Sequence, residues 1–180
     1  GLIAVKLFQD WGTHYVDLWC GTPAQRQTVL VDTGSATTAF PCSECTLDNC
    51  GQLDSFHTDG AYRGELSTSF RKAPCSDCFL GDCSDNQCSF GVSYQEGSNW
   101  TAVESIENCY LGGLHTAPVT AKTTTTSTTN DAWDPREAPS YSFDLRFGCQ
   151  TQITGDFRRQ MADGIAGFNV GRFSIWNQMY

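Results

Sequence analysis

Residues 29–35 read Val-Leu-Val-Asp-Thr-Gly-Ser, and this stretch decides the fold. The continuous aliphatic run at its start predicts a strand buried on both faces. That strand carries Asp32 to the edge of a core, where a carboxylate is costly unless it is hydrogen-bonded or shares a proton. Thr33 and Ser35 supply hydroxyls, and Gly34 lets backbone N–H groups approach the carboxylate. Asp-Thr-Gly is also common turn chemistry, so the tripeptide alone leaves a simple turn open.

Two further segments give this stretch its setting. Upstream, residues 14–20 alternate in polarity and run into Gly-Thr-Pro at 21–23, a pattern that predicts a hairpin. Far downstream, residues 162–168 read Ala-Asp-Gly-Ile-Ala-Gly-Phe. Together the three segments resemble the first lobe of a pepsin-like aspartic protease, and the resemblance extends from about Thr13 to Met179.

The resemblance implies an all-β fold, the N-terminal lobe of the bilobal acid protease fold, with a cysteine-rich insert and one short C-terminal helix. We expect residues 1–180 to form this lobe, residues 42–90 to form the insert and residues 116–140 to form a flexible loop. Ser174 is the candidate N-cap of the helix, which is expected over residues 175–180.

The resemblance also implies a mechanism. Proteases of this family use two facing aspartates that share one proton, because two like charges so close do not both ionise. One carboxylate activates a water as a base, and the other, protonated, polarises the scissile carbonyl. By resemblance Asp32 is one of the pair, the Gly34 N–H and the Ser35 hydroxyl keep it ionised, and Thr33 braces the loop against a partner lobe.

The sequence contains no second Asp-Thr-Gly or Asp-Ser-Gly. Asp163 and Gly164 lack the intervening hydroxyl residue, and Ile165, Ala166 and Gly167 resemble the family's supporting element beneath the catalytic loop. We therefore expect the second aspartate in a missing C-terminal lobe. The chain is then a fragment of a longer protein, which we favour, one chain of a two-chain enzyme, or half of a dimer of the retroviral kind.

Residues 89–101 predict a hairpin, with alternating apolar residues on its first strand. Tyr94 and the Glu96-Gly97-Ser98 that follows resemble the family's flap, which closes over substrate; an ordinary surface hairpin is the alternative. By resemblance Tyr94 orders the substrate and excludes water, while Glu96, Gly97 and Ser98 line the substrate groove.

Two features near the flap extend or depart from the family pattern. Many members carry a tryptophan at the position of Ala39 to support the flap tyrosine, so Phe40 is the candidate replacement here. Glu96 is an acid that can pair with a substrate arginine. The segment 40–42 and the flap resemble the plasmepsin V branch, which cleaves Arg-containing export motifs, although plant members carry an acid there without that specificity.

The chain has ten cysteines, an even and high number that predicts disulfides and a secretory route. Seven of them lie in the insert, which resembles that of nepenthesin-type plant proteases and their protist relatives. The ten are Cys20, Cys42, Cys45, Cys50, Cys75, Cys78, Cys83, Cys88, Cys109 and Cys149.

Four of these cysteines, at 75, 78, 83 and 88, also have the spacing of a zinc knuckle with cysteine in place of histidine. The segment lacks a basic surface and the other six cysteines indicate an oxidising compartment, so disulfides are favoured and no metal is expected. If these four pair among themselves, three remain in the insert and three in the lobe. At least one disulfide must then join the insert to the lobe.

The charge balance excludes some partners. With 11 Lys and Arg against 20 Asp and Glu, the formal net charge is −9, which disfavours nucleic acid and anionic membranes. No apolar run reaches the ~18 residues of a membrane span. The start at Gly1 without a methionine suggests a processed or trimmed chain, and the compartment expected is extracellular or an acidic lumen.

The remaining expectations are brief. Asn99-Trp100-Thr101 is a candidate N-glycosylation site. His14, His57 and His115 show no metal-ligand spacing, and no cofactor is expected. The predicted function is an aspartic endopeptidase acting on peptides or proteins, with little activity in this lobe alone. The alternative is a catalytically inactive pepsin-like protein that binds or inhibits another enzyme.

Overall fold

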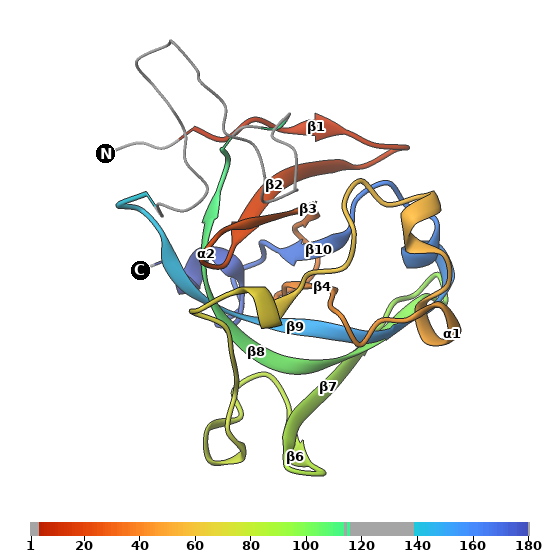
Figure 1. The fold of residues 1–180 in the computed structure, drawn as a ribbon. Coiled ribbons are helices and arrows are strands. Elements are labelled where there is room, and N and C mark those ends of the chain that lie inside the picture. The colour runs from red at the N-terminus through yellow and green to blue at the C-terminus, as the bar shows by residue number, and fades with distance from the viewer. Residues whose placement is uncertain (1–3, 114, 116–138, 180) are drawn as a thin grey trace.

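The computed structural model describes residues 4–113, 115 and 139–179. It is built almost entirely of strands, so the all-β prediction is confirmed (Figure 1). The strands are β1 Phe8–Gln9, β2 His14–Cys20, β3 Gln25–Asp32, β4 Ala39–Pro41, β5 Arg71–Lys72, β6 Asp82–Ser84, β7 Gln87–Ser93, β8 Asn99–Leu111, β9 Phe143–Ile153 and β10 Gly164–Gly167. The predicted loop over residues 116–140 lies, except for its last two residues, outside the described part.

The helices are short. They are α1 Leu47–Cys50 and α2 Ile175–Gln178, with 3-10 turns at Leu53–Ser55, Gly64–Leu66, Cys75–Asp77 and Gly155–Arg158. The sequence predicted only the C-terminal helix, and α1 was missed because it is a single turn inside the cysteine-rich insert. Ser174 does precede α2, but its side chain makes no capping hydrogen bond. Among the helices in the described residues, none has the length and apolar character that a membrane crossing requires.

The sheet follows the order β1-β2-β3-β10-β4-β9-β8-β7-β6. An additional pairing of β2 with β8 closes six of these strands into a ring (Figure 1), and β5 pairs with the middle of β8 at Ser105 and Ile106. The predicted hairpin is confirmed, with Tyr15 opposite Leu30 and Cys20 opposite Gln25. Two pairings are parallel, β10 with β3 and β4 with β9, and both lie next to the segment that follows Asp32.

Two apolar clusters occupy the two faces of these central strands. Neighbouring residues alternate between them: Val29 and Phe40 belong to one cluster, while Leu30 and Ala39 pack in the other. The expectation that residues 29–31 are buried on both faces is wrong beyond Val29. Leu30 and Val31 are only half-buried, because they face an open pocket.

All ten cysteines form disulfides, so the disulfide prediction is confirmed over the zinc alternative. The pairs are Cys20–Cys109, Cys42–Cys149, Cys45–Cys50, Cys75–Cys83 and Cys78–Cys88. The four cysteines with zinc-knuckle spacing pair among themselves, as the counting argument assumed. The disulfide between Cys42 and Cys149 is the one that this argument required between insert and lobe.

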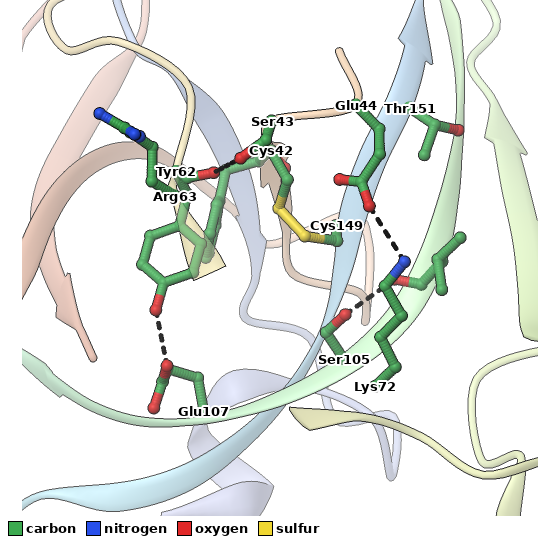
Figure 2. The surroundings of a disulfide bond; sticks show 12 residues. Cys42, Ser43, Glu44, Tyr62, Arg63, Lys72, Ser105, Glu107, Cys149 and Thr151 are labelled. Carbon is green, nitrogen blue, oxygen red and sulfur yellow. Dashed lines mark hydrogen bonds and ion pairs between the residues drawn. A yellow bond between two sulfur atoms is a disulfide. The ribbon is translucent and has the colours of Figure 1, made fainter. Parts of the chain in front are cut away.

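This disulfide lies next to a buried polar pair (Figure 2). Tyr62 donates its hydroxyl to a carboxylate oxygen of Glu107 at 2.6 Å, and both residues are fully buried. The other Glu107 oxygen accepts the backbone N–H of Asn108. Burial, followed by the bond to Glu107, raises the pKa of Tyr62, so the phenol remains protonated.

Replacing Tyr62 by Phe should therefore destabilise the fold by about 1–3 kcal/mol, because a buried carboxylate oxygen of Glu107 loses its donor. Denaturant unfolding of the two proteins measures the difference. Tyr141→Phe is the control, since Tyr141 is exposed and its change should cost less than about 0.5 kcal/mol. Equal losses in the two variants would contradict a stabilising role for the Tyr62–Glu107 bond.

Candidate active site

A pocket of about 470 Å³ opens at the end of β3 beside Asp32. Apolar side chains form part of its wall and carboxylates from four different segments reach it. The lining residues are Asp10, Trp11, Thr13, Leu30, Val31, Asp32, Tyr94, Glu96, Asp156, Phe157, Arg159, Gln160 and Ile165. The structure thus brings together Asp32, Tyr94 and Glu96, which the sequence had placed in separate motifs.

The loop after β3 holds Asp32 from its backbone. The Gly34 N–H donates to Asp32 Oδ1 at 2.8 Å, as expected. A side chain at position 34 would begin 3.1 Å from that oxygen, so glycine leaves the carboxylate room. The expected bond from Ser35 is not formed in this state: the Ser35 hydroxyl is buried and has no partner among the described residues. Thr33 is exposed at the tip of the loop, where no described residue covers it.

Strand β10 supports this loop from beneath. It pairs in parallel with β3, with Ile165 opposite Leu30 and Gly167 opposite Asp32. The Asp32 carbonyl accepts the Phe168 N–H at 2.7 Å. A side chain at Gly167 would overlap the backbone of the loop at Ala36, so only glycine permits this crossing. The fold therefore places Ile165 and Ala166 beside β3, and Gly167 directly against the loop that follows Asp32.

Asp163, just before β10, is a buried carboxylate with its own network. Its Oδ2 accepts the Thr28 N–H at 2.6 Å and the Thr28 hydroxyl at 2.7 Å, and its Oδ1 accepts the Asp59 N–H at 2.8 Å. Arg26 binds the Asp59 carboxylate through two N–H groups at 2.8 and 3.0 Å. Burial, and then the charge of Asp59, raises the pKa of Asp163 to about 8. The three hydrogen bonds act in the opposite direction and lower this pKa, but their effect is smaller.

The predicted flap is the turn that joins β7 and β8. Its backbone closes with the Tyr94 N–H on the Ser98 carbonyl, and the Tyr94 ring lies 5.2 Å from that of Phe157. Glu96 is exposed at the pocket, and Gly97 is at the tip. Ser98, expected in the groove, is buried instead and accepts the Asp156 N–H at 3.0 Å, so it anchors the turn at Gly155–Arg158.

Phe40 does not replace the missing tryptophan of the flap. Its ring stacks 4.3 Å from Phe147 and lies edge-on to Tyr62, within the opposite apolar cluster. The expectation for Phe40 was wrong because β4 is a strand, in which adjacent side chains point to opposite faces. Ala39 faces the flap side, and Phe40 points away from it.

Sequence analysis missed the loop between β1 and β2. The buried Asp10 carboxylate accepts the N–H groups of Trp11, Met161 and Ala162 at 2.6, 3.2 and 3.3 Å. This fixes the backbone of Trp11 at the pocket, while its indole stays 81% exposed. The residues that anchor this loop lie about 150 positions away, so no local pattern could have identified it.

The described residues contain no cluster of three or more His, Cys, Asp or Glu suited to a metal ion. His57 is buried with its Nε2 2.8 Å from the Phe157 carbonyl, and burial lowers its pKa. His115 pairs with Asp17 at 2.9 Å. Asn99 begins β8 and is half-buried; its glycosylation stays a prediction.

Comparison with known proteins agrees with this geometry. A family model described as "Xylanase inhibitor N-terminal" matches residues 14–180. The chain belongs to this family. The match agrees with the sequence motifs, which resemble the N-terminal lobe of pepsin-like aspartic proteases of the nepenthesin and plasmepsin V group.

Several relatives of this pepsin-like lobe are aspartic proteases by name. Plasmepsin V of Plasmodium falciparum is 29% identical over 175 residues, which cover 94% of the chain and 25% of the relative. Aspartic protease 5 of Toxoplasma gondii is 31% identical over 178 residues, which cover 89% of the chain and 16% of the relative. Aspartic proteinase nepenthesin-1 of Nepenthes gracilis is 28% identical over 123 residues, which cover 66% of the chain and 27% of the relative. The chain spans a quarter or less of the first two proteins.

The Asp163 network predicts that the pepsin-like lobe is more stable in acid. The raised pKa means that the folded state holds a proton that the unfolded state releases above pH ~4. This contribution is fully present below the unfolded value and is lost as the pH rises toward 8, by up to about 1.4 kcal/mol per pH unit. The unfolding temperature of Asp163→Asn should therefore decrease less between pH 4 and pH 8 than that of the wild-type protein.

Thermal unfolding across this pH range measures the effect. Asp144→Asn is the control, because Asp144 is exposed and pairs with Arg71 at the surface. An unchanged slope in Asp163→Asn would show that Asp163 is ionised throughout the range.

Proposed function

We propose that the chain supplies one catalytic half of an aspartic endopeptidase. Asp32 is one of two carboxylates of the dyad, and a second lobe outside these 180 residues carries the other. The observation that carries this proposal is the placement of Asp32 at the mouth of a pocket, on a loop built by Gly34 and braced by β10. The names of the relatives agree with it.

In the proposed reaction the dyad holds one proton between its two carboxylates. The ionised carboxylate accepts a proton from a water, whose oxygen attacks the scissile carbonyl carbon. The protonated carboxylate donates to the carbonyl oxygen. Collapse of the tetrahedral intermediate breaks the C–N bond, and the leaving amine takes up a proton. The Gly34 N–H stabilises negative charge on Asp32, and Tyr94 covers the pocket so that bulk water is excluded.

The pocket chemistry suggests a preferred substrate side chain. Its wall offers apolar surface from Leu30, Phe157 and Ile165. Glu96 and Asp156 add two carboxylates to the same lining, in which Arg159 is the one guanidinium. A long side chain with an aliphatic stem and a cationic end, such as arginine, matches such a wall. We propose that Glu96 contacts this cationic end. The five disulfides support a protein that folds in the secretory pathway.

The second candidate function is a binding or inhibitor protein, because the matching family model carries the description of a xylanase inhibitor. An intact Asp32 loop beside an open pocket favours the protease, since a binding protein has no need of an oriented carboxylate there.

The test uses the full-length protein from its source and a peptide library at acidic pH. Wild-type protein should show cleavage that pepstatin blocks, and Asp32→Asn should lower it at least ~100-fold, because the variant loses a catalytic acid–base group. Asp144→Asn is the matched surface control and should cleave normally. Retained cleavage in Asp32→Asn would overturn the proposal, and absence of cleavage in wild-type protein would favour the binding function.

The role of Glu96 needs a paired substrate. Glu96→Gln should lower kcat/KM for an Arg-containing peptide about tenfold relative to its norleucine counterpart, because a charge-assisted hydrogen bond is lost. Glu65→Gln changes another exposed acid, which lies outside the pocket, and should leave the ratio unchanged. An unaltered ratio in Glu96→Gln would assign the specificity to other residues.

A further inference from the structure

The turn after β9, residues 155–162, forms one wall of the pocket and is called the pocket turn below. Four of its residues line the cavity, and its regular structure is a single 3-10 turn at Gly155–Arg158. So short a 3-10 segment makes few hydrogen bonds of its own, and its conformation therefore depends on contacts with the rest of the lobe. The groups that hold the pocket turn thus determine the shape of the pocket.

The disulfide-rich insert supplies several of these contacts. Arg158 donates to the backbone carbonyl of Asn49 in α1 at 3.1 Å. Thr58 donates both its backbone N–H and its hydroxyl to the Met161 carbonyl, at 2.8 and 2.9 Å. The insert therefore packs directly against the pocket turn at both of its ends.

His57, also in the insert, binds the backbone of Phe157, whose ring lines the pocket. Its Nε2 lies 2.8 Å from the Phe157 carbonyl oxygen, and because a carbonyl only accepts, Nε2 carries the proton and donates. Both residues are buried, His57 with 8% and Phe157 with 6% of its surface exposed. Phe157 shares an apolar cluster with Leu53, and the Leu53 carbonyl accepts the backbone N–H of His57 at 2.8 Å. A fixed backbone and a buried ring therefore set the position of this donor.

The backbone N–H groups that follow Phe157 are used elsewhere. Those of Arg159 and Gln160 both donate to the Asp156 carbonyl, at 2.9 and 3.0 Å. The Phe157 carbonyl is therefore left for a partner outside the pocket turn. Burial lowers the pKa of His57, which favours a neutral ring whose one N–H makes this bond.

We propose that His57 is a positioning residue for substrate binding: through its bond to the Phe157 carbonyl, it holds the Phe157 ring in place as the wall of the pocket. This inference rests on the proposed protease function. The described lining of the pocket does not include His57, so His57 acts on the substrate only through Phe157. Asp32 is held by its own loop and by β10. Loss of the His57 bond should therefore weaken substrate binding and leave the chemical step intact.

Kinetics of the full-length protein, with a peptide from the library that it cleaves, test this proposal. His57→Leu removes the donor but keeps a side chain that fits a buried site, and it should raise KM about tenfold while kcat changes less than about twofold. His57→Gln places an amide N–H at the same number of bonds from Cβ, so it should return KM to within about threefold of wild type. A KM that His57→Leu leaves unchanged, or that His57→Gln fails to restore, would overturn the inference.

Tyr62→Phe is the matched control, because it also removes a buried hydrogen bond but lies in the apolar cluster on the other face of the central strands. It should leave KM unchanged, which separates the effect of His57 from a general loss of stability. A rise in KM equal to that of His57→Leu would assign both effects to destabilisation and contradict a positioning role.

A second measurement does not depend on activity. In ligand-free protein, hydrogen exchange of the Arg159 and Gln160 amides, taken relative to the amides of β8, should become about tenfold faster in His57→Leu and stay near wild type in His57→Gln. Equal relative rates in wild-type protein and His57→Leu would overturn the inference. If wild-type protein cleaves no peptide, the proposed function fails by itself, and the exchange rates still decide whether His57 holds the pocket turn.

Discussion

The parallel pairing of β3 with β10 is the constraint on which the rest of the site depends. It brings residues more than 130 positions apart into register, so that Gly167 lies opposite Asp32 and Ile165 opposite Leu30. Because the loop after Asp32 then crosses close over Gly167, no larger side chain fits there. The position of the Asp32 carboxylate is therefore fixed by backbone hydrogen bonds and by a missing Cβ, neither of which needs a flexible side chain to hold it.

The same pairing explains why the charges beneath the site are buried. Thr28 on β3 and Asp163 before β10 bond to each other on both sides, which clamps the two strands where the parallel register begins. Asp59 and Arg26 extend the clamp to the insert side of the lobe. Burying so many ionisable groups costs free energy unless each is paired or neutral. Burial and the charge of Asp59 raise the pKa of the Asp163 carboxyl, which favours its neutral form and so reduces this cost under acidic conditions.

The sequence was informative wherever a short stretch determines its own structure. The turn at Asp32, the β2–β3 hairpin, the turn between β7 and β8 and the counting of cysteines each need only local pattern or parity, and the structure agrees with them. It was uninformative where the structure depends on which face of the sheet a residue takes, or on partners far along the chain. Phe40 and Ser98 were placed on the wrong side for the first reason, and the anchoring of Trp11 by Asp10 was missed for the second.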